Sequence, residues 1–237
     1  MSLTVVPTSE LFAMSRPGWT GHAHARFDSM QPGDVGYLEL GPLRLCALDH
    51  LVAGTGIDMH RHEDTEIVTL LLDGALEHED TTGVVTRLAA ASVATTAAGS
   101  GIEHAERATN AGDVRCLQIW LEPRTRGRTP SFAKRALDLG PELTKLASGS
   151  DPAAMFIDSD ADVWAASMSP ASTVTHTLRS NRAGYLVCPR ADVMLGDRRV
   201  RAGERALITG PAELEVRALG ATELLLLDLC LGESAQA

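Results

Sequence analysis

Apolar and polar residues alternate with a period of two along much of the chain, and this pattern predicts strands rather than helices. In the first half, runs rich in leucine and β-branched residues predict strands over 43–48, 66–72, 75–79 and 114–121. Asp73-Gly74 separates two of these runs and predicts a tight hairpin. A second series of short strands is expected at 163–168, 185–188, 193–195, 205–208 and 224–229.

Other segments show weaker patterns. Residues 1–19 have no clear period, and strand character is expected to begin at 36–40. The segment 122–132 is rich in Arg, Thr, Pro and Gly, which predicts a linker. A short helical turn is expected at 141–146.

Many short strands without a long amphipathic helix indicate an all-β sandwich or barrel. Because the pattern repeats, we expect two β-barrels. The first domain is predicted at residues 1–123, and the linker with the second domain at 124–237.

Composition is consistent with a globular protein, since 44% of the 237 residues are apolar and 22% are charged. No run approaches the ~18 apolar residues that a membrane span needs, and the first residues do not resemble a secretion signal. The four cysteines are far apart and form no Cys-x-x-Cys motif. We therefore expect buried, reduced thiols in a cytoplasmic protein.

The formal net charge of −10 disfavours nucleic acid and anionic membranes as partners. Arg124, Arg126 and Arg128 form a local basic cluster, but they lie among Gly, Thr and Pro. A solvated linker is the favoured interpretation of this cluster.

Candidate chemistry lies in two short motifs, His60-Arg61-His62 and His104-Ala105-Glu106. Alternate residues of a strand share a face, so two adjacent strands could aim three imidazoles and one carboxylate at one point. Such a set suits a divalent transition metal with open coordination positions. His78 could lie near this metal or simply pair across the sheet. His176 stands alone in the second half, which predicts one metal per chain.

These motifs resemble a known family. Gly54-x5-His60-x-His62-x3-Glu66 and Gly101-x2-His104 are similar to the two cupin motifs. The blocks HRHEDTEIVTLLLDGALEHEDTTG and AAGSGIEHAE resemble the signature blocks of pirin and pirin-like proteins, specifically over residues 54–123.

The resemblance implies a bicupin, an architecture of two cupin-type β-barrels. It also implies His60, His62, His104 and Glu106 as metal ligands, without Glu66. Iron(II) is the ion that the family resemblance implies, while the donor set also suits Mn, Co, Ni, Cu or Zn.

Two departures from the family pattern concern the pocket. Arg61 stands where the family usually has Pro, and the upstream aromatic-rich segment retains only Phe27. Because a flat aromatic ligand needs aromatic walls, we expect altered pocket chemistry.

The activity implied by the resemblance is dioxygenolytic ring opening of quercetin-like flavonols, with a small aromatic molecule and O2 as partners. Glu106 would also serve as a base in this hypothesis. Arg61, Glu77 and Glu103 are further candidates around the site. The alternative is a non-enzymatic, metal-binding regulator that acts through a protein partner. A weaker third hypothesis is a metal-dependent isomerase or hydrolase.

Overall fold

The computed structural model describes residues 1–232 and confirms the all-β prediction. Its one short helix in this part of the chain is a 3-10 turn, η1 (Thr8–Glu10). The strands are β1 (Ser2–Val6), β2 (Phe12–Arg16), β3 (Trp19–Ala25), β4 (Leu43–Leu51), β5 (Gly56–His62), β6 (Glu66–Asp73), β7 (Ala75–Asp80), β8 (Val85–Ala89), β9 (Ser92–Ala97), β10 (Ile102–Ala108), β11 (Val114–Leu121), β12 (Ser131–Ala136), β13 (Thr144–Ser148), β14 (Met155–Phe156), β15 (Ala161–Met168), β16 (Thr173–Leu178), β17 (Arg182–Val187), β18 (Val193–Leu195), β19 (Arg198–Val200), β20 (Arg205–Thr209), β21 (Ala212–Ala218) and β22 (Thr222–Cys230).

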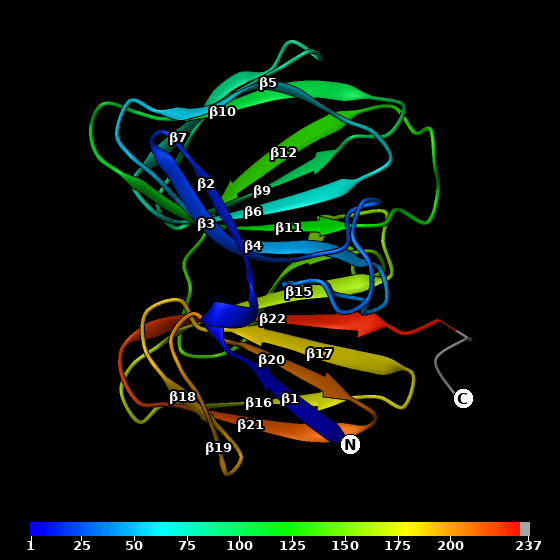
Figure 1. The fold of residues 1–237 in the computed structure, drawn as a ribbon, viewed down its shortest axis with the longest axis vertical. Helices are drawn as coiled ribbons and strands as arrows, with labels where there is room; N and C mark the ends of the chain where they lie inside the picture. The colour runs from blue at the N-terminus through cyan, green and yellow to red at the C-terminus, as the bar shows by residue number, and fades with distance from the viewer. Residues whose placement is uncertain (233–237) are drawn as a thin grey trace.

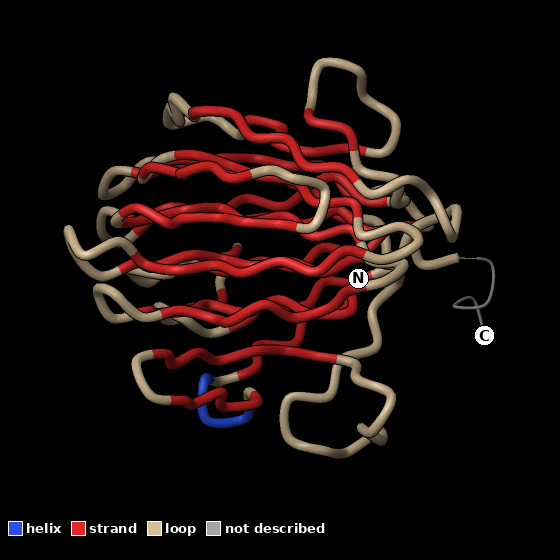
Figure 2. Tube along the Cα trace, turned by 90° about the horizontal axis from the view of Figure 1, so that it is seen from above, coloured by secondary structure: helices blue, strands red, loops and turns tan. Residues whose placement is uncertain are grey.

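Four sheets form two halves, one above the other in Figure 1. Each half pairs a seven-stranded sheet with a four-stranded sheet, and the seven-stranded sheets face each other in the middle of the molecule. Figure 2 shows the strands from above, running side by side with loops at both ends. This is a cupin fold in which two separate sheets, rather than one continuous ladder, enclose each barrel.

Each half receives one strand from the other side of the predicted domain boundary at residues 123 and 124. β1 joins the sheet of the second half by pairing with β20, while β12 joins the sheet of the first half by pairing with β9. The division of the chain at 123 and 124 stays a prediction, but the sheets cross it in both directions.

The largest apolar core lies between the two seven-stranded sheets, where Leu117 and Ile119 of β11 meet Leu225 and Leu227 of β22. A second core fills the interior of the second barrel. The interior of the first barrel holds two smaller apolar clusters, centred on Leu51 and on Leu45. Polar groups therefore occupy part of the first barrel.

Several local predictions are wrong. The expected helical turn at 141–146 is a loop that leads into β13, because Leu146 and Ala147 pack into the core between the halves. Residues 1–19 contain β1, η1 and β2, and β12 begins inside the predicted linker. These strands form because they pair with other strands of the sheets, and the local sequence pattern does not show such pairing.

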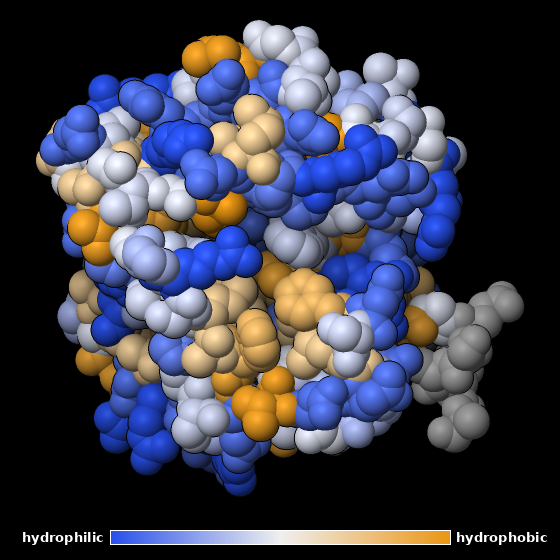
Figure 3. Space-filling view, turned by 45° about the horizontal axis from the view of Figure 1, so that its top comes forward, coloured by the Kyte–Doolittle hydropathy of each residue, from blue (hydrophilic) through white to orange (hydrophobic). Residues whose placement is uncertain are grey.

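Surface properties agree with the composition. Figure 3 shows a face on which apolar groups gather in a band across the middle, with charged groups above and below. Within residues 1–232, no helix has the length and apolar character needed to cross a bilayer. The four cysteines are unpaired, as predicted, and Cys46, Cys116 and Cys188 are buried.

Candidate metal centre

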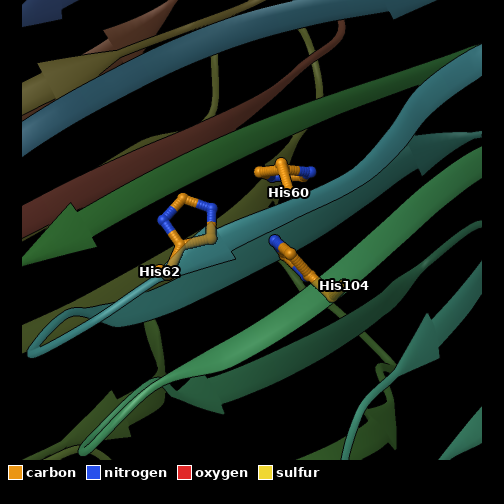
Figure 4. A group of neighbouring side chains, drawn as sticks. All are labelled: His60, His62 and His104. Carbon is orange, nitrogen blue, oxygen red and sulfur yellow. The ribbon is translucent and has the colours of Figure 1, made fainter.

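Three histidines converge inside the first barrel. His60 lies opposite His104 in the antiparallel pairing of β5 with β10, and His62 follows on the same face of β5. Figure 4 shows the three rings turned toward a common space. Their ring centroids are 4.4 to 4.9 Å apart, and one nitrogen from each lies within 4.8 Å of the others.

The unpaired nitrogens of these rings fit a bound cation. Nε2 of His62 and both ring nitrogens of His104 are buried and have no hydrogen-bond partner within residues 1–232. Buried polar atoms without partners are costly, so they are rare in native proteins unless a ligand satisfies them. The three-histidine group could therefore hold a metal ion.

The protonation state of these rings also favours metal binding. Burial, strengthened by neighbouring imidazoles, lowers the pKa of His62 to about 4 and that of His104 to about 3. Both rings are then neutral at pH 7 and offer a lone pair. Nδ1 of His60 donates to the backbone carbonyl of Asp58 at 2.8 Å, which leaves Nε2 as its ligand atom.

Glu106, the fourth ligand implied by the resemblance, falls in a second group. It forms a cluster with His78 and His104, again with one ligand atom of each within 4.8 Å. The pairing of β10 with β5 is irregular after His104, so Glu106 lies opposite Ile57, and on its other side it lies opposite His78 of β7. His104 is thus shared by two possible ligand sets.

His78 both pairs across the sheet and lies near the candidate centre. Its Nε2 is 2.9 Å from Asp80, and its ring stacks on Phe132 with centroids 4.2 Å apart. Burial raises the pKa of Asp80, but hydrogen bonds from Thr82 and His78 outweigh this and hold it below its ordinary value. A charged carboxylate therefore fixes the orientation of the His78 ring.

Two residues of β11 support Glu106, and the sequence analysis did not identify them. Gln118 donates from Nε2 to Glu106 at 2.8 Å, while Trp120 donates from Nε1 to Gln118 at 2.9 Å. The Trp120 ring also meets His62 edge to face, with centroids 4.7 Å apart. The available signal was the alternation of Gln118 and Trp120 on one face of a strand.

A cavity of about 750 Å³ adjoins the histidines, with His60 and Gln118 in its wall. Four aromatic side chains from separate segments line it: Phe12, Trp19, Phe27 and Trp120. Phe27 makes edge contacts with Phe12 and with Trp120, at centroid distances of 6.3 and 6.2 Å. β2, β3 and β11 therefore supply aromatic rings to the cavity beside Phe27, the one aromatic residue that the upstream segment retains. Altered pocket chemistry stays a prediction.

The other candidate residues lie outside this cavity. Glu77 and Glu103 are exposed, on the faces of β7 and β10 opposite to the histidines. Arg61 is also exposed and bonds to Glu63 at 2.9 Å. Glu66 is buried but belongs to neither ligand group. Burial raises its pKa to about 7.

Both candidate ligand groups of the described chain lie in the first half. In the second half, His176 is engaged with Asp228 at 2.9 Å, and apolar side chains fill the barrel interior. One metal per chain stays a prediction.

Comparison with known proteins places the chain in a family. The sequence model of the family described as Pirin matches residues 20–121, and that of the quercetinase C-terminal cupin domain matches residues 146–229. A pirin-like protein of Caulobacter vibrioides is 35% identical over 216 residues, which cover 89% of this chain and 93% of that protein. The chain belongs to the pirin family. Among its pirin-type relatives, the quercetin 2,3-dioxygenase of Escherichia coli K12 is 25% identical, covering 90% of this chain and 92% of the relative.

Solved structures show that the fold is shared along the whole pirin chain. Bacterial pirin YhhW from Escherichia coli, solved in complex with nickel(II), superposes with a TM-score of 0.87 at 21% identity, covering 97% of this chain and 99% of that one. A quercetin 2,3-dioxygenase from Acinetobacter baumannii gives a TM-score of 0.75 at 17% identity, covering 98% and 87%.

Proposed function

We propose that this protein is a metal-dependent dioxygenase that opens flavonol-type substrates with O2. The observation that supports this most directly is the adjacency of unpartnered, neutral imidazoles and a cavity walled by aromatic rings. Relatives named quercetin 2,3-dioxygenase, in sequence and in structure, agree with this assignment.

In this proposal His60, His62, His104 and Glu106 hold one divalent ion. Three imidazoles and one carboxylate form a nitrogen and oxygen donor set that suits Fe(II), our proposed occupant, and also Mn, Co, Ni, Cu or Zn. The nickel complex of a related pirin fits the same donor preference. When bound, the ion would supply Lewis acidity and lower the pKa of a substrate hydroxyl.

The protein's own groups would bind and orient the substrate. The cavity volume lies within the usual range of ligand sites, roughly 300–1,000 Å³. Phe27 and Trp120 would pack against a flat ring system, while Gln118 holds Glu106 in place. The unpaired thiols fit the reducing cytoplasm that we propose as the location.

The test is anaerobic mixing of a flavonol with protein loaded with one metal at a time, followed by a pulse of O2. We expect the flavonol absorption band to bleach with equimolar oxygen uptake, and the His104→Ala variant to show neither. If all six metals leave flavonol and oxygen unchanged, the proposal is wrong and the regulator hypothesis, with a protein partner, is favoured.

A further inference from the structure

A buried carboxyl group lies in the cavity wall outside both ligand groups. Asp49 is on β4, where Leu45, Ala47 and Asp49 alternate into the first barrel, and all three line the cavity that His60 also lines. Asp49 is only 5% exposed. Burying a carboxyl group without a complete set of partners costs free energy, and carboxyl groups in such surroundings are concentrated at functional sites.

The surrounding strands hold one oxygen of this carboxyl and leave the other available. Trp19 donates from Nε1 to Oδ1 at 3.1 Å. On the adjacent strand, a Cβ at Gly21 would lie 2.1 Å from the same oxygen, so the missing side chain makes room for the carboxyl. No second donor to Asp49 exists among the described residues. Oδ2 therefore remains for a group inside the cavity.

The charges around Asp49 allow it to change protonation near neutral pH. Burial raises its pKa to about 7, against the opposing effect of the Trp19 hydrogen bond. Glu106 raises the pKa further and Arg205 lowers it. Cys116, opposite Asp49 on β11, is neutral because burial raises the pKa of its thiol well above its ordinary value. A general base works best when its pKa lies near the working pH.

We propose that Asp49 is the catalytic base that takes the proton from the hydroxyl group of a ligand bound in the cavity. The ligand O–H bond breaks, its electron pair stays on the ligand oxygen, and a new O–H bond forms at Oδ2 of Asp49. The proton returns to the product before release. This inference rests on the proposed function, since it requires a hydroxylated aromatic ligand in the cavity.

Glu106 is less suited to this role. Its Oε2 already accepts a hydrogen bond from Gln118, and the proposed metal set needs the other oxygen. Two carboxyl groups therefore divide two tasks in this site, with Glu106 as ligand and Asp49 as base.

The test uses the Asp49→Asn and Gly21→Ala variants, with Asp113→Asn as the matched control. The first removes the base, whereas the second keeps the carboxyl but displaces it. Asp113 is an exposed carboxyl of the same half, outside the cavity, so the control makes the same chemical change elsewhere. Full-length protein is loaded with nickel under nitrogen and mixed with 3-hydroxyflavone or 4-nitrocatechol, whose ionised forms absorb at distinct wavelengths. Metal content is measured for each sample.

We expect the wild type and Asp113→Asn to bind these probes in the deprotonated form. Asp49→Asn and Gly21→Ala should bind them protonated at unchanged metal content. Flavonol turnover should fall ~10²–10⁴-fold in Asp49→Asn, which is the usual contribution of a general base. The turnover rate of the wild type should rise through pH 7, and this rise should be absent from Asp49→Asn.

The outcomes separate the two proposals. Equal probe ionisation in Asp49→Asn and wild type would overturn the role of Asp49 and leave the dioxygenase proposal standing. Asp49-dependent ionisation of 4-nitrocatechol without any flavonol turnover would support the base and overturn the flavonol activity. A wild type that binds neither probe would overturn both.

Discussion

The two ligand groups that share His104 make different predictions for single alanine substitutions. If the ion is held by His60, His62 and His104, His62→Ala should abolish binding, whereas His78→Ala should retain it. His104→Ala should abolish binding in either case, because His104 belongs to both groups.

The expected size of the effect follows from binding linkage. An ion present at 100 times its dissociation constant stabilises the folded protein by about 2.7 kcal/mol. At about 2.1 cal/mol/K per residue, the unfolding entropy of 237 residues is roughly 0.5 kcal/mol/K. Added metal should therefore raise the Tm of the wild type by about 5 °C.

Calorimetry with and without metal, together with elemental analysis, measures this difference. We expect a metal-dependent rise of about 5 °C in wild type and His78→Ala, and no rise in His62→Ala. His78→Ala should lower the Tm in both conditions, because it removes the stacking on Phe132 and the bond between His78 and Oδ2 of Asp80. A rise that persists in His62→Ala but vanishes in His78→Ala would place the ion in the second group and refute the proposed ligand set.

Three further predictions concern the support of the site. Trp120→Phe removes the donor to Gln118 and should weaken metal affinity ~10–100-fold in a competition titration. The control is Trp164→Phe, which should leave metal affinity unchanged because Nε1 of Trp164 has no partner within residues 1–232. Asp49→Asn should be more stable than wild type at pH 8, by at most roughly 4 kcal/mol in urea unfolding, and similar at pH 3. The pKa of Asp49 is about 7 in the folded protein and 3.8 ordinarily, so the wild type loses stability as pH rises between these two values. Gly101→Ala should cost about 1–3 kcal/mol in the same assay, because φ at this position is +129°.

The histidine cluster was accessible from the sequence because it depends on local geometry. Alternation within a strand sets His60 and His62 on one face. The hairpin predicted at Asp73-Gly74 is wrong: the chain turns there, with φ of +78° at Gly74, but β6 pairs with β9 and β11, whereas β7 pairs with β8 and β10 of the other sheet. The position of Glu106 was not accessible in the same way. An irregularity in the pairing of β5 and β10 shifts it opposite Ile57, and sequence alternation alone cannot show such a shift.

The cavity could not be predicted because its wall is assembled from segments far apart in the chain. Phe12, Trp19 and Trp120 belong to three strands whose order in the sheet is a property of the whole fold. Asp49 was hidden for a related reason. It follows an ordinary apolar strand pattern, and only the packing of β3 shows that it is buried against Gly21.

The chain cannot be divided cleanly at residue 123, because β1 pairs with the second half and β12 pairs with the first. A polypeptide that stops at residue 123 would contain β1 without its partner β20 and would expose the edge of β9 that β12 normally covers. Open strand edges of this kind favour intermolecular pairing and aggregation. The half that contains the histidine cluster is therefore unsuited to independent expression, and gene duplication followed by loss of one half would need compensating changes at both edges.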